Sequence, residues 1–228
     1  QIAVVDALLY NRDELENALG LPENCGLSDE ELLLRLVLEL GFDKLSMVNG
    51  DFCGAVYEPT QKQWTLFRDH LGVRPLYYYL DERIFVFSTD IRGIASVEGL
   101  DLRVNEEKLF ARLNFCNHLS LQQTDYANVH CILPAAVTRI IPSNGCYTLE
   151  EKPYWKLRSR KIRLENDTAY ANRMRSLVED AVRRRLDAVP GLIGAELSGG
   201  LDSSIICAVC AEEMAKDGKQ LSTFSVDY

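Results

Sequence analysis

The chain has 228 residues, of which 47% are hydrophobic and 26% charged, and this suits one large or two modest globular domains. Its net charge of −9 argues against nucleic-acid binding as the main activity, because phosphate contacts need Lys and Arg. With no secretory signal and no apolar run near the roughly 20 residues that span a membrane, the sequence predicts a cytoplasmic protein without a membrane segment.

The first forty residues predict one strand and two helices. Residues 1–9 form an apolar run typical of a buried strand. Asn11 can cap a short helix that Gly20 ends. Ser28 and Glu31 have the spacing of a capping box at the start of an apolar-rich helix. Because the chain opens in strand-like sequence without Met, a first segment is expected to be missing.

From residue 45 to residue 154, short apolar runs alternate with turn residues. The predicted strand pairs are 51–57 with 64–68, 76–80 with 84–88, and 137–141 with 146–149. Such hairpins form antiparallel sheet, and a helix is predicted around 105–113. Residues 1–155 are therefore predicted to be an α+β domain.

The second half has a different pattern. Residues 156–166, which begin with the basic run KLRSRKIR, are predicted to link the first domain to a second one at 167–228. The predicted elements there are a helix at 168–186, a strand at 193–197, a helix at 205–214 and a strand at 221–226. Strand, loop, helix and strand make a βαβ unit, and a parallel sheet needs more strands than these, so the second domain is expected to be truncated.

The segment Glu196–Ser204, ELSGGLDSS, has the composition of a phosphate-binding loop. Consecutive glycines let backbone N–H groups approach an anion at the start of a helix, and Ser198, Ser203 and Ser204 add hydroxyl groups. Asp202 is a hard oxygen ligand of the kind that Mg²⁺ prefers beside phosphate. A Walker A motif is absent. The complete string favours a phosphate loop over an incidental strand-to-helix turn.

SGGLDSS resembles the pyrophosphate loop of the ATP-pyrophosphatase superfamily, in the form found in asparagine synthetases and their relatives. The resemblance implies ATP and Mg²⁺ as cofactors, activation of a carboxylate as an acyl-adenylate, and attack by an amine. The ATP and pyrophosphate contacts that it implies are Leu197, Ser198, Gly199, Gly200, Asp202, Ser203 and Val226, with Asp202 also as the Mg²⁺ ligand.

The first half resembles the N-terminal glutaminase domain of the same family. Arg68–Tyr77, RDHLGVRPLY, matches its signature, and the order of motifs extends the resemblance over nearly the whole chain. This implies an Ntn-type αββα sandwich followed by the beginning of an α/β parallel-sheet domain. The family's glutaminase releases ammonia from glutamine, and Asp29 matches the position that holds the glutamine amine.

Two features depart from a working glutaminase. That enzyme needs an N-terminal Cys nucleophile, and the first cysteine here is Cys25, so no catalytic residue is assigned in this chain. The family builds its oxyanion hole in a strand that ends Asn-Gly-Glu-Ile-Tyr-Asn. Tyr10 and Asn11 match, whereas Val5 and Ala7 do not. Aliphatic side chains cannot donate to an oxyanion, and losing one donor costs about 10²–10³ in rate.

Three functions remain open. The first is glutamine-dependent asparagine synthesis, with ATP, glutamine or ammonia and a carboxylate as substrates. The second is an amide-forming cyclase of the β-lactam or lasso-peptide macrolactam type, with a degenerate glutaminase domain. The third is a non-catalytic binding module. A homodimer is a possible assembly, and these 228 residues alone are expected to be inactive.

Other reactive residues are assigned structural roles. The seven cysteines are scattered and odd in number, which predicts reduced thiols rather than a disulfide framework. Cys207 and Cys210 have CxxC spacing but lie in an apolar helix without a second ligand pair, so buried core thiols are expected. The three histidines show no metal-ligand spacing.

Overall fold

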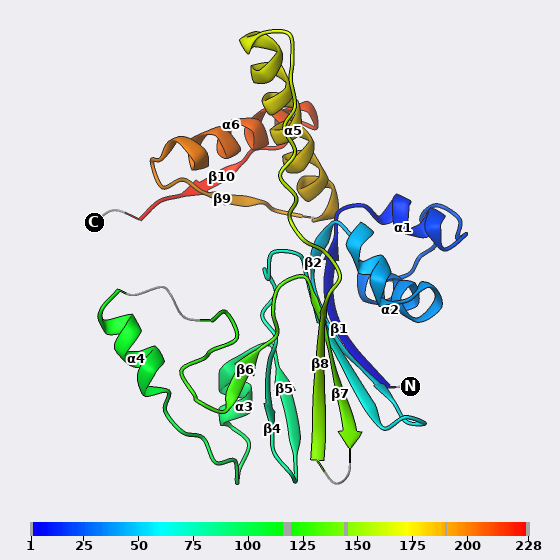
Figure 1. The fold of residues 1–228 in the computed structure, drawn as a ribbon. Coiled ribbons are helices and arrows are strands. Elements are labelled where there is room, and N and C mark those ends of the chain that lie inside the picture. Colours follow the sequence, from blue (N-terminus) through cyan, green and yellow to red (C-terminus); the bar gives the residue numbers. More distant parts are fainter. Residues whose placement is uncertain (1, 116–119, 144–145, 190, 227–228) are drawn as a thin grey trace. The chain divides into compact units, whose positions relative to one another are not determined.

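The structure is a computed structural model that describes residues 2–115, 120–143, 146–189 and 191–226 (Figure 1). The chain divides into two compact units, Gln1–Leu157 and Arg158–Tyr228. Helices and strands occur in both units, which confirms a mixed α and β fold. Across the described ranges, no helix combines the length and apolar character needed to cross a membrane.

The first unit contains two sheets. Its strands are β1 Ile2–Leu9, β2 Gly50–Glu58, β3 Gln63–Arg68, β4 Tyr77–Leu80, β5 Phe85–Ser88, β6 Val129–Cys131, β7 Ala136–Ser143 and β8 Cys146–Pro153. One sheet has the order β1-β2-β3-β7-β8 and the other the order β5-β4-β6. All neighbouring strands in both sheets are antiparallel, as the hairpin spacing predicts. Residues 144–145, which follow β7 in the chain, lie outside the described residues.

Helices cover the outer faces of the two sheets. They are α1 Arg12–Ala18, α2 Asp29–Leu40, the 3-10 helix η1 Phe42–Met47 and α3 Ile91–Ala95. A further helix, α4 Glu106–Leu113, contributes no residue to the cores beneath them. Alternate residues of a strand point to opposite faces. Val56 of β2 lies in the core formed with α1 and α2, whereas its neighbour Ala55 shares a core with Tyr78 of β4. Tyr79 packs with Ile94 of α3. The layers are therefore helix, sheet, sheet and helix.

The start of α2 and the start of α1 differ in how they are capped. At α2 the predicted capping box is confirmed, since Ser28 Oγ accepts the Glu31 N–H at 3.2 Å and Glu31 accepts the Ser28 N–H at 2.8 Å. Asn11 is the N-cap residue of α1, as predicted, but its side chain forms no capping hydrogen bond. Asn11 is 5% exposed, and its side chain instead donates to the Met47 carbonyl and accepts the Asn49 N–H. Long-range partners thus replace the local cap.

The second unit contains the predicted βαβ arrangement. Its elements are α5 Asp167–Ala188, β9 Gly194–Glu196, α6 Leu201–Lys216 and β10 Ser222–Phe224. Strands β9 and β10 are parallel, with Glu196 opposite Phe224, and α6 connects them. Both strands therefore end at the same edge, where the serine-glycine loop follows β9.

Candidate functional site

The serine-glycine loop leads from β9 directly into α6. Gly199 has φ +78°, a left-handed conformation that favours glycine. Helix α6 begins at Leu201, earlier than the predicted Ile205, and Gly200 at its N-cap offers no side chain to cap it. The N–H groups at the start of a helix need partners from outside it. The first turn of α6 can therefore donate to an anion in the loop.

Serine hydroxyls line the same loop. The Oγ atoms of Ser198 and Ser203 lie 3.0 Å apart, and the Ser203 and Ser204 hydroxyls donate to the Gly200 carbonyl at 3.1 and 2.7 Å. Asp202 is exposed on the first turn of α6. The described residues contain no group of three His, Cys, Asp or Glu side chains that could hold a metal ion. Asp202 thus stands as a single carboxylate on the first turn of α6.

The residues predicted to contact adenosine lie at the edge where β9 and β10 end. The Leu197 N–H donates to the Phe224 carbonyl at 2.9 Å, and the Ser225 hydroxyl donates to the Leu197 carbonyl at 2.6 Å. Val226 follows and is 65% exposed. Ser225 was not predicted from the sequence, although a hydroxyl residue directly after a strand was a usable signal. Ser225 fixes the backbone from which the loop starts.

Asp29 in the first unit has both carboxylate oxygens occupied. One accepts the Leu9 N–H at 2.7 Å, and the other accepts the Arg12 guanidinium in an ion pair. Arg12 also donates to the Leu27 carbonyl at 2.8 Å and to Glu16 at 3.2 Å. Partial burial opposes protonation, but the hydrogen bond and charge of Asp29 raise the pKa of Arg12. A cation of the chain itself therefore occupies the predicted ammonium site.

Strand β1 directs Asp6, rather than Val5 or Ala7, into the space between the two sheets. Val5 and Ala7 pack in the core on the helix side of the sheet. Asp6 points to the other face, opposite Cys53 of β2, and lies 3.5 Å from Arg74. Counted back from the matching Tyr-Asn pair, the family's Asn also falls on Asp6. The comparison with Val5 was therefore wrong, although an ionised carboxylate still cannot donate to an oxyanion.

Cys53, which faces Asp6 across the β1–β2 pair, is a buried thiol. Burial, followed by the charge of Asp6, raises the pKa of Cys53 to about 12, so this thiol stays protonated at neutral pH. Cys207 and Cys210 are buried on α6, as predicted. The described cysteines are all free, which confirms the prediction for them, and Cys116 lies outside the described residues.

Comparison with known proteins agrees with the motifs. A family model for a glutamine amidotransferase domain matches residues 2–155, and one for asparagine synthase matches residues 173–228. A Methanocaldococcus jannaschii protein, provisionally named asparagine synthetase [glutamine-hydrolyzing] 2, is 31% identical over 100% of this chain and 43% of its own. Asparagine synthetase [glutamine-hydrolyzing] 3 of Bacillus subtilis is 33% identical, over 96% of this chain and 35% of its own length. Amidase chyE of Penicillium rubens is 27% identical, over 96% of this chain and 32% of its own length. The chain thus spans less than half the length of these relatives.

Proposed function

The chain belongs to the glutamine amidotransferase family and continues into the start of an asparagine synthase domain, and on that premise we propose that it is part of an ATP-dependent amide ligase. The ligase would convert a carboxylate into an acyl-adenylate, release pyrophosphate and join the acyl group to an amine. The observation that carries this proposal is the serine-glycine loop itself. It contains Gly199 with its positive φ and leads into the N-terminus of α6, which has no side-chain cap.

Each predicted residue has a role in this proposal. The loop from Ser198 to Ser203 binds pyrophosphate through backbone N–H groups and hydroxyls, and Asp202 binds Mg²⁺ with the phosphate oxygens. The edge formed by Leu197 and Val226 receives adenosine. Titration calorimetry on the chain tests these roles: MgATP and magnesium pyrophosphate should bind and compete with each other. If MgATP binds but pyrophosphate does not displace it, the loop is not the pyrophosphate site.

We propose glutamine as the first candidate for the source of the amine. The layer order of the first unit agrees with an Ntn-type sandwich, and the whole chain aligns with proteins named as glutamine-hydrolysing asparagine synthetases. In this version Asp29 binds the amine of glutamine, and a cytoplasmic location supplies glutamine and ATP. A homodimer remains a prediction.

Two ion pairs favour a second candidate, a cyclase whose amine is already part of the acyl substrate. Asp6, paired with Arg74, stands where the family has the Asn of its oxyanion hole, and Arg12 neutralises Asp29. In a form of the protein with a complete synthase domain, release of ammonia from glutamine would eliminate the cyclase. ATP-dependent amide formation without glutamine would support it, and a lack of any carboxylate activation would leave the non-catalytic module.

A further inference from the structure

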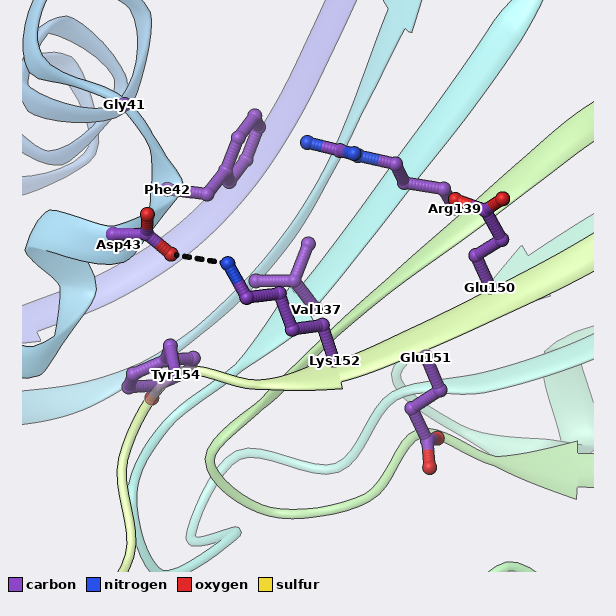
Figure 2. A pocket seen from close by; sticks show the side chains of 9 residues that line it. All are labelled: Gly41, Phe42, Asp43, Val137, Arg139, Glu150, Glu151, Lys152 and Tyr154. Atoms are coloured by element: carbon purple, nitrogen blue, oxygen red, sulfur yellow. Dashed lines mark hydrogen bonds and ion pairs between the residues drawn. The ribbon is translucent and has the colours of Figure 1, made fainter.

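A cleft of about 390 Å³ lies in the first unit, between the start of η1 and the hairpin of β7 and β8 (Figure 2). Its floor is Val137 of β7, which is 6% exposed, and the half-buried rings of Phe42 and Tyr154 stand at its sides. The floor is apolar because Val137 belongs to the core under the helix layer. The helices leave β8 exposed along its whole length, so the cleft is open on that side.

Charged side chains surround this apolar floor. Arg139 of β7 and Glu150 of β8 are directly opposite in register, so both point to the same face of the sheet. Lys152 pairs with Asp43 at 3.2 Å across the cleft, as Figure 2 shows. Neither Arg139 nor Glu150 forms a hydrogen bond or ion pair through its side chain within the described part of the chain. The cleft therefore offers one unused cation and one unused anion side by side.

Glu151 also borders the cleft but does not contribute its charge to it. It accepts a hydrogen bond from Gln122 at 2.9 Å on the other face of the hairpin, and its side chain points away from the cleft in Figure 2. The four side chains that face the cleft, Arg139, Lys152, Glu150 and Asp43, have a formal charge of zero. A phosphate or dicarboxylate would meet two carboxylates, and a simple cation would meet two basic groups.

We propose that this cleft binds a free α-amino acid with an apolar side chain. The planar guanidinium of Arg139 pairs with the ligand carboxylate, and Glu150 accepts its ammonium group. The apolar side chain lies on Val137 between the rings of Phe42 and Tyr154. Cavities of this volume are within the range of small-molecule sites. The cleft shares no residue with the loop or with Asp29, so it goes beyond the proposed ligase site.

The test uses the 228-residue chain and three probes: L-phenylalanine, 3-phenylpropionate without the ammonium group, and phenethylamine without the carboxylate. Saturation-transfer NMR and calorimetry should show saturable binding of L-phenylalanine. Arg139→Gln should weaken L-phenylalanine and 3-phenylpropionate about tenfold, as expected for losing a charged hydrogen bond. Glu150→Gln should weaken L-phenylalanine and phenethylamine but not 3-phenylpropionate.

Arg35→Gln and Glu39→Gln are the matched controls, because this exposed pair lies on α2 outside the cleft. Both should bind L-phenylalanine as the unchanged chain does. Circular dichroism confirms that each variant is folded. The proposal is overturned by a lack of saturable binding of L-phenylalanine, L-leucine and L-methionine at millimolar concentration, or by binding that Arg139→Gln and Glu150→Gln leave unchanged.

Discussion

The guanidinium of Arg12 is bound to the carboxylate of Asp29, at the end of β1 where Leu9 donates its N–H to the same carboxylate. Glu16, which is 1% exposed, accepts a second hydrogen bond from Arg12. Because Arg12 neutralises this carboxylate, an ammonium group from a substrate gains less from Asp29 while Arg12 stays in place. This contact therefore separates the two proposed sources of the amine.

Arg12→Ala is predicted to open an ammonium site at Asp29. The loss of charged hydrogen bonds should lower the free energy of unfolding by about 2–3 kcal/mol. Methylammonium chloride and L-glutamine should then raise the melting temperature of this variant by binding to the free carboxylate. If the protein is the cyclase, neither should do so in the unchanged chain, whereas a glutamine-dependent ligase requires L-glutamine to do so there too. Differential scanning fluorimetry against an equal concentration of sodium chloride measures the difference.

Two variants control this experiment. Arg12→Ala combined with Asp29→Asn removes the carboxylate and should abolish the effect of methylammonium. Arg92→Ala removes the partner of Asp90 in an exposed ion pair. This variant should lose only that surface pair. An equal rise in melting temperature for the unchanged chain and for Arg12→Ala would show that Arg12 does not close the site.

Gly199→Ala is predicted to weaken MgATP and pyrophosphate binding at least tenfold. Gly199 and Gly218 both have positive φ, at +78° and +69°, and both have open space around their Cα atoms. Alanine should therefore cost about 1 kcal/mol of stability at either position. Only Gly199 belongs to the loop, so calorimetry should show normal binding for Gly218→Ala. Equal losses of binding would mean that general destabilisation is the cause.

Ser225→Ala is predicted to weaken ATP binding more than pyrophosphate binding. The substitution removes the hydroxyl that holds the Leu197 carbonyl, a hydrogen bond with a net value of about 1 kcal/mol. Leu197 lies on the proposed adenosine side, so competition between the two ligands should shift toward pyrophosphate. Ser225→Thr keeps the hydroxyl and should restore ATP affinity. A uniform loss for both ligands would contradict a role in positioning the adenosine edge.

Glu16→Gln is predicted to reduce the acid sensitivity of the fold. Although desolvation opposes it, hydrogen bonds from Asn24 and Cys25 and the charge of Arg12 lower the pKa of Glu16 below its ordinary 4.5. A carboxylate with a lowered pKa in the folded state stabilises above its unfolded pKa and loses this contribution as pH falls through the folded value. The stability difference between the two proteins should be constant near neutrality and shrink in acid. Urea titrations at several pH values measure it, and a difference independent of pH would contradict the prediction.

Local patterns were sufficient for much of the fold. Alternating apolar residues and turn signals predicted the hairpins, and the glycine loop between an apolar strand and a helix predicted the βαβ unit. Strand β6, Val129–Cys131, was not predicted because three residues show no periodicity. It forms because β4 supplies its pairing partner. Short elements such as α3 likewise depend on the surface that they cover.

The site was predictable where its residues are neighbours in the sequence. The loop needs only Ser198 to Ser203, and its composition identifies it. The contact between Arg12 and Asp29 spans 17 positions and depends on how α1 folds beside α2, so no local pattern reveals it. The period of two along β1 separates Val5 from Asp6, but only the packed sheets show which of them lies between the layers.

The central claim is that the loop serves an adenylating amide ligase. Exchange of labelled pyrophosphate into ATP, measured with a panel of carboxylates, tests it most directly in a form of the protein that carries a complete synthase domain. Exchange should appear only when a suitable carboxylate is present and should fall at least tenfold in Gly199→Ala but not in Gly218→Ala. A lack of exchange with every carboxylate, in protein that still binds MgATP, would contradict the claim.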